Sequence, residues 1–173
     1  MPEALRVAFI SLLLLISLIA YFLTLRAFCP RRVAQTRAAA DTLPGRSLAV
    51  GLVNFLFFGA LTLILITITD RVGNSPLKIL TLLPTLFFIA LLGVGLSFGL
   101  AGVVELVGER LAPAQSAFRR TLWGTLSLSL GSALPFVGWF LLLPYAGLLG
   151  LGAFIISFFY REPRPGPLPP IKD

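Results

Sequence analysis

The sequence contains no histidine and a single cysteine, and only 12% of its 173 residues are charged. The lack of histidine excludes histidine-based acid–base chemistry and most metal and haem ligand sets, and one cysteine excludes an intrachain disulfide. Soluble domains carry about twice this share of charge, ~25%. With 57% hydrophobic residues and a mean hydropathy of +0.96, the chain cannot coat a water-facing surface. The composition therefore excludes a soluble globule, and we expect no cofactor.

The few charges are mostly basic. Fourteen Lys and Arg against seven Asp and Glu give a formal net charge of +7. In a soluble protein this balance would suggest nucleic acid, but here the basic residues lie between apolar runs, which is typical of membrane topology. We therefore expect the lipid bilayer as partner, and neither nucleic acid nor a metal.

Three apolar blocks open the chain, at about 7–28, 47–69 and 79–104. At 1.5 Å per residue the first covers ~33 Å, enough for a bilayer core of ~30 Å. Its only charge, Arg26, stands near its end, and further arginines follow, as in a stop-transfer flank. The run also exceeds the ~7–15 residues of a signal-peptide core, so we expect an uncleaved anchor.

The last apolar block, residues 121–160, contains no charge. A single helix of this length would measure ~60 Å, twice the hydrocarbon thickness, so the chain must turn back. Pro135 and Gly138 lie in the best turn sequence, Gly-Ser-Ala-Leu-Pro-Phe-Val-Gly. The block is either a tight hairpin of two spans, 121–134 and 137–160, or a re-entrant arm followed by one span.

The distribution of basic residues favours five spans over four. With five spans, one side of the membrane has eleven basic residues: five in the first loop, three in the third loop and three in the tail. The other side has three. Four spans give eight against six, and the positive-inside rule prefers the uneven arrangement. We predict an all-α, five-segment transmembrane domain over residues 1–160, with its N-terminus outside and its C-terminus in the cytoplasm. Residues 161–173 are predicted to form a proline-rich flexible tail.

Small and polar residues inside the spans are candidates for packing or for lining a cavity. Gly95 and Gly99 form a GxxxG pair around Ser97, while Asn54 and Ser127 place polar groups in other spans. In lipid, close backbone approach and interhelical hydrogen bonds hold helices together. The same residues could instead form a hinge or the wall of a polar cavity, and the sequence leaves both readings open.

Ionised residues are confined to the ends of the spans. Glu105 closes the third block, where we expect a boundary residue whose carboxylate reaches water. Ion-coupled transporters generally need charges near the midplane, so their absence disfavours such a role. Arg31, Arg32 and Arg37 begin a basic, alanine-rich stretch, which we interpret as a positive-inside loop or a short amphipathic surface helix. In either case its partner is lipid headgroup phosphate.

The second half of the chain carries a resemblance. Glycine and proline interrupt the apolar residues in four segments. These are Leu-Gly-Val-Gly-Leu-Ser-Phe-Gly-Leu-Ala-Gly (92–102), Val-Gly-Glu-Arg-Leu (107–111), Leu-Pro-Phe-Val-Gly-Trp (134–139) and Gly-Leu-Leu-Gly-Leu-Gly-Ala (147–153). Residues 91–159 resemble a membrane module of bacterial multi-pass proteins in which it can follow a bactofilin-like β-domain, which this chain lacks. The resemblance implies anchoring or organising at a membrane, here the bacterial plasma membrane, and brings no catalytic residues.

Two functions remain from the sequence. Within the spans there is no Ser–His, Ser–Lys or paired-carboxylate arrangement, so an enzyme is disfavoured. We expect a small non-catalytic integral membrane protein that acts as a scaffold, anchor or assembly partner for other membrane subunits or itself. The alternative is an oligomeric channel or facilitator for a small solute, lined by Asn54, the serines and the glycines.

Overall fold

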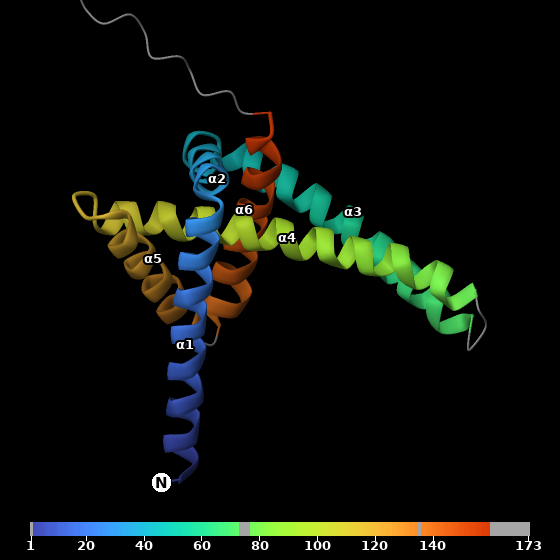
Figure 1. Ribbon diagram of the computed structural model, residues 1–173, viewed down its shortest axis with the longest axis horizontal. Coiled ribbons are helices and arrows are strands. Elements are labelled where there is room, and N and C mark those ends of the chain that lie inside the picture. Colours follow the sequence, from blue (N-terminus) through green and yellow to red (C-terminus); the bar gives the residue numbers. More distant parts are fainter. Residues whose placement is uncertain (1, 73–76, 135, 160–173) are drawn as a thin grey trace, which may run out of the picture.

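A computed structural model describes residues 2–72, 77–134 and 136–159, and these residues form helices and no strand. The helices follow the chain in the order drawn in Figure 1, six α-helices with one π-helical turn, η1, between the last two. Their bounds are α1 Pro2–Phe28, α2 Pro30–Thr42, α3 Pro44–Arg71, α4 Leu77–Leu111, α5 Ala117–Ser132, η1 Gly138–Leu142 and α6 Leu143–Ser157.

Two prolines separate the first three helices. Pro30 and Pro44 are the first residues of α2 and α3, where a fixed φ and a missing N–H cost nothing. Cys29 and Leu43 precede them with φ of −129° and −132°, because a residue before proline is forced out of the helical region. Each junction is thus a single residue, which changes the direction of the chain and seats α2 as a short helix between two long ones.

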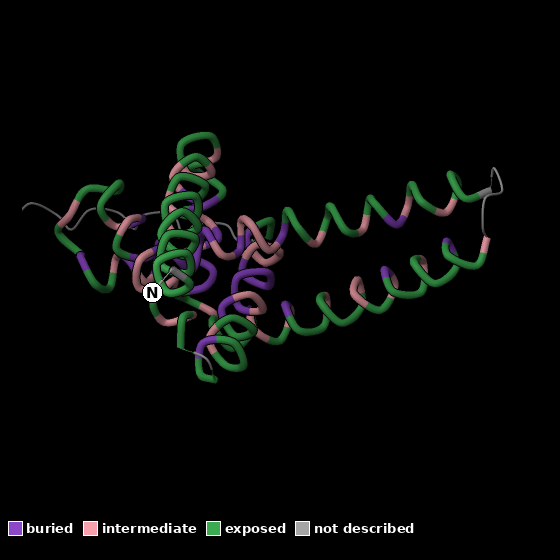
Figure 2. The backbone as a smooth tube through the Cα atoms, turned by 90° about the horizontal axis from the view of Figure 1, so that it is seen from below, coloured by how far each residue is buried: buried purple, intermediate pink, exposed green. Residues whose placement is uncertain are grey.

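The core lies where α2, the C-terminal half of α4, α6 and the start of α3 meet, as the buried residues in Figure 2 show. The stretch 101–106 of α4 is buried on all sides. Helix α2 buries one whole face, made of Val33, Thr36, Ala39 and Ala40. The alanine-rich stretch is therefore an integral part of the core and neither a loop nor a helix lying free on a surface.

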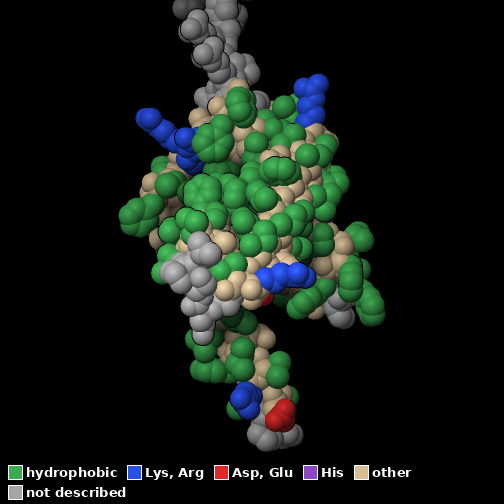
Figure 3. Space-filling model, turned by 90° about the vertical axis from the view of Figure 1, so that its right-hand side faces the viewer, with side chains coloured by type: hydrophobic (Ala, Val, Ile, Leu, Met, Phe, Trp, Pro, Cys, Tyr) green, Lys and Arg blue, Asp and Glu red, His purple; other side chains and the backbone are tan. Residues whose placement is uncertain are grey.

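Away from this core, two long helices form an arm. The C-terminal part of α3 and the N-terminal part of α4 leave the core together, transverse to α1 and α6 (Figures 1 and 2). In the most apolar 18-residue stretch of each arm helix, 11% of the residues are buried. Figure 3 shows a face dominated by hydrophobic side chains, with few Lys and Arg.

Among the described residues, four helical segments are long and apolar enough to cross a membrane: Glu3–Phe28, Pro44–Arg71, Lys78–Leu111 and Gly138–Ser157. The all-α fold is therefore confirmed, but five spans are not, because α5 has 16 residues, ~24 Å of helix. The tight hairpin is not confirmed either. After the turn the arms part: α5 packs on α4 and α1, whereas α6 packs on α3 and α4.

Several expected boundaries shift in the structure. Helix α4 runs on to Leu111 instead of ending near residue 104, and it continues through Pro84. The last segment begins with the π-helical turn at Gly138 and ends at Ser157. The expected turn residue Pro135 and the tail 161–173 lie outside the described residues.

Candidate functional site

Glycines make the closest helix crossings of the core. At the crossing of α3 and α6, a Cβ on Gly51 would collide with the Leu148 carbonyl, and one on Gly152 with the Ser47 carbonyl. At the crossing of α4 and α6, a Cβ on Gly150 would lie 2.5 Å from the carbonyl carbon of Gly99. Backbones touch directly at both crossings, so they leave no lumen there, and any side chain would push the helices apart.

Helix α4 meets its other neighbours in the same manner. Gly108 faces the carbonyl of Arg120, and Gly124 faces that of Val104, which brings α4 and α5 into backbone contact. On another side of α4, a Cβ on Gly102 would lie 2.7 Å from Cγ2 of Thr36 in α2. Small residues thus form contacts of α4 with α2, α5 and α6.

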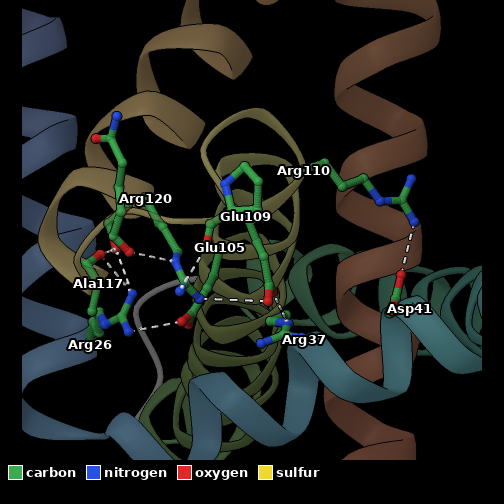
Figure 4. Close-up of polar contacts among 11 residues, drawn as sticks. Arg26, Arg37, Asp41, Glu105, Glu109, Arg110, Ala117 and Arg120 are labelled. Atoms are coloured by element: carbon green, nitrogen blue, oxygen red, sulfur yellow. Dashed lines mark hydrogen bonds and ion pairs between the residues drawn. The ribbon is translucent and has the colours of Figure 1, made fainter.

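A cluster of charged residues surrounds the C-terminal half of α4 (Figure 4). Arg26, near the end of α1, places Nη2 2.9 Å from Oε1 of Glu105. Its Nη1 donates to the Ala117 carbonyl at 2.9 Å and to Oγ1 of Thr121 at 3.0 Å, both in α5. The Glu105 side chain is only 8% exposed, so the expected water-facing boundary residue is buried and ion-paired. This contact joins α1, α4 and α5.

The next turn of α4 contributes a second acid, Glu109. Its Oε2 lies 2.8 Å from Nε of Arg37, an ion pair whose N–H is not aligned for a hydrogen bond. Its Oε1 lies 3.6 Å from Nη1 of Arg120. Farther out, Nη2 of Arg110 donates to Oδ1 of Asp41 at 2.9 Å. Helices α1, α2 and α5 are therefore each attached to α4 by an ion pair.

The charged cluster joins helices through paired charges. Each of its three carboxylates faces an arginine, so the charges are compensated within the protein. Among the described residues, no group of three or more Cys, Asp or Glu is placed to hold a metal ion. Buried charges persist in an apolar setting only when paired, as Glu105 is, and the pairs of the cluster lie between four helices.

A second feature is an apolar groove between α3, α4 and α6, with a volume of about 580 Å³. It contains Asn54 and Gly95, together with Leu151, Phe154 and Phe158. Asn54 is the one polar side chain among the described residues that line the groove, and its Nδ2 donates to the Val50 carbonyl of its own helix at 2.8 Å. Two residues that the sequence marks independently, Asn54 and Gly95, therefore share one site.

The other candidate residues lie elsewhere. Ser127 is half-buried in α5, which makes no substantial contact with α3, so the serines and Asn54 do not share a wall. Ser97 donates to the Gly93 carbonyl at 2.7 Å on α4. A Cβ on Gly138 would lie 2.5 Å from the Gly131 carbonyl, just across the turn from α5.

The three arginines expected at lipid headgroups have different surroundings. Arg31 is exposed, and Arg37 is ion-paired with Glu109. The guanidinium carbon of Arg32 lies 4.4 Å from the ring centroid of Phe158. Only the last contact links the basic helix to the groove.

Sequence reasoning missed the buried face of α2 and the ion pairs between distant segments. The first has a weak signal, since Val33, Thr36 and Ala40 recur at helical spacing and are small enough for close packing. The ion pairs have none, because charges at the ends of separate spans give no information on which of them meet.

No protein-family model, no curated protein and no solved structure matches this chain. The resemblance of residues 91–159 therefore stays a prediction, and function has to be argued from the geometry.

Proposed function

We propose that this chain is an integral membrane protein without catalytic activity that serves as a scaffold, anchor or assembly partner for other membrane subunits. The observation that carries the proposal is the arm of α3 and α4. Both helices leave the core with large hydrophobic side chains exposed along them, among them Phe57, Leu83 and Phe87. In a membrane such surfaces are covered by lipid or by another protein, and the arm offers them well away from the closed core.

One face of the arm has the shape that transmembrane helices use for docking. Gly93 is exposed, and a Cβ placed there would meet no atom of the described residues within 4 Å. Ser97, four residues on, is a near neighbour on the same helix surface. Small residues at this spacing let a second helix approach closely. The anchoring role implied by the resemblance is consistent with such a partner.

Gentle purification of tagged protein tests the assembly role. We expect further subunits, or a second copy, to migrate with the wild type in several mild detergents. Gly93→Leu should release them, since it fills the docking face without an internal clash. Gly45→Leu, also free of neighbours within 4 Å, is the matched control and should retain them. A wild type that is strictly monomeric and alone in every detergent contradicts the proposal.

For topology we propose five membrane segments in a bacterial plasma membrane, with the N-terminus outside. Arg26 lies against Ala117 at the start of α5, and Arg32 lies over Phe158 just after α6. One end of the α5–α6 unit thus lies against the end of α1 and the other against the start of α2, which supports an entry and an exit on the same side.

The helix lengths are compatible with strong tilts. Because α1 is transverse to the arm, both can cross one bilayer only if each of them is tilted from the membrane normal. Helix α1 has 27 residues, ~40 Å, and at a tilt of ~40° it still covers ~30 Å. Helices α3 and α4 are longer still, with 28 and 35 residues.

Labelling of single cysteines from outside intact cells tests the orientation of the first three segments of this topology. In a Cys29→Ser background, we expect an impermeant thiol reagent to react with Glu3→Cys and Lys78→Cys but not with Ala114→Cys. The reverse pattern would contradict the orientation, and labelling of only one of the first two would contradict the number of spans between them.

The alternative function is an oligomeric channel or facilitator. What favours it is Asn54, whose amide faces a groove large enough for a small solute. Liposomes with wild-type protein should then conduct a solute that empty liposomes exclude, and Asn54→Leu should reduce that flux. Under the assembly role, both proteins leave the liposomes as tight as empty ones.

A further inference from the structure

The apolar groove ends at a cation that has no acidic partner among the described residues. Of the arginines around α2, Arg26 is held by Glu105 and Arg37 by Glu109. Arg32 makes no ion pair within the part of the chain that the structure describes, and its guanidinium lies over the ring of Phe158. Phe158 is also a wall of the groove. One aromatic ring therefore connects an exposed positive charge with an apolar cleft.

The position of Arg32 suits an anionic group. Its guanidinium carbon lies over the ring of Phe158, and its N–H groups donate no hydrogen bond to the described residues, so they can pair with the oxygens of a phosphate. The ring contact also restricts a long side chain, which lowers the entropy lost on binding.

The groove itself suits a hydrocarbon chain. Its volume of about 580 Å³ is within the range of sites that enclose small ligands, ~300–1,000 Å³. It follows α6 from Leu151 to Phe158, roughly 10 Å along the helix. Its polar group, Asn54, binds its own helix through Nδ2, and its Oδ1 accepts no hydrogen bond from the described residues.

The geometry points to a specific site for one anionic phospholipid, with an acyl chain in the groove between α3, α4 and α6 and the headgroup phosphate on Arg32. This goes beyond the assembly role, since it assigns a ligand to a different surface from the docking face at Gly93 and holds whether or not a partner subunit exists. The occupant is a retained lipid, distinct from the exchangeable lipids around the arm.

The test is native mass spectrometry of the full chain after reconstitution with equimolar phosphatidylglycerol and phosphatidylcholine. The wild type should retain one lipid, with the anionic one favoured about fivefold, the factor given by one basic residue at a membrane surface. Arg32→Gln should bring this preference close to one. Arg46→Gln removes an exposed arginine from the start of α3 and should leave the preference unchanged.

Blocking the groove is the second test. Val94 lines the groove and is 49% exposed, so Val94→Trp adds bulk there without entering the core. We expect it to lose the retained lipid. Leu83→Trp, on the same helix but outside the groove, should keep it. If Val94→Trp fails to fold by circular dichroism, Leu91→Trp on the same wall replaces it.

Three results would overturn the lipid site. They are a wild type that retains no lipid or shows no preference, an anionic preference that survives Arg32→Gln, and a retained lipid that survives the groove-filling variant. A groove occupied by a second copy, seen as a dimer that Val94→Trp abolishes while no lipid is retained, would also overturn it. Subunits released by Gly93→Leu but not by Val94→Trp would leave the assembly role intact in each of these cases.

Discussion

Glu105 gives the sharpest test of how the core is held together. Its carboxylate is 8% exposed and lies 2.9 Å from Arg26, which itself is 24% exposed. Glu105→Gln preserves the size of the side chain but leaves the arginine charge without its counter-ion. Removing one partner of a buried pair costs ~3–5 kcal/mol. Arg26 keeps its two hydrogen bonds to α5 and part of its exposure, so we expect the loss to be nearer ~2 kcal/mol.

The other acids of the cluster provide graded controls. Glu109 and its partners have side-chain exposures near 30%, and Asp41 and Arg110 are 45% and 69% exposed. A solvent-exposed pair contributes ~0–1 kcal/mol. The expected order of the losses is therefore Glu105→Gln, then Glu109→Gln, then Asp41→Asn, with the last below ~0.5 kcal/mol.

Reversible unfolding in mixed micelles, followed by circular dichroism, measures these differences. A second measurement separates charge from packing: Arg26→Met combined with Glu105→Leu removes both charges and should restore most of the stability, because an apolar pair can replace a buried ion pair. If Asp41→Asn costs as much as Glu105→Gln, or if Glu105→Gln costs nothing, burial does not govern the strength of these contacts.

Further predictions concern the small residues and the groove. Gly150→Ala places a methyl group against the backbone of Gly99 and should cost ~1–3 kcal/mol in the same assay, whereas Gly59→Ala, which has no neighbour within 4 Å, should be neutral or slightly stabilising. Thr36→Leu, at a fully buried position facing Gly102, should destabilise by a similar ~1–3 kcal/mol, and a stability as little changed as that of Gly59→Ala would contradict close packing of α2. Asn54→Leu should leave stability within ~1 kcal/mol, since its amide hydrogen bond lies within its own helix, and a larger loss would show that the groove polar group is structural.

The helices could be predicted where charges and prolines in the sequence mark their ends. The apolar runs within α1, α3 and α4 are bracketed by charges and prolines, and hydrocarbon accepts no other secondary structure for such runs. The expected start of α3 at residue 47 is three residues from Pro44, because the first turn of a helix can contain polar residues without changing its conformation.

The arrangement of the helices was not predictable in the same way. Helix α2 is basic and alanine-rich, and this composition is compatible both with Ala39 and Ala40 facing water and with their facing a neighbouring helix. The burial of Glu105 depends on Arg26 from a distant span, and such pairings leave no trace in local sequence. The direction of the arm depends on helix crossings at glycine pairs such as Gly51 and Gly152. The spacing of glycines along the sequence does not specify the angle at which two helices cross.

The position of α2 has a consequence for the order of assembly during synthesis. Helix α2 emerges early, but the surfaces that cover Val33 and Ala39 belong to α4 and α6, which are translated much later. Until α6 is complete, the short helix can pack on α4 but not on α6, so Ala39 and Ala40 lack part of their cover. Premature termination before Gly138 would thus leave α2 only partly covered, about a hundred residues away from the break.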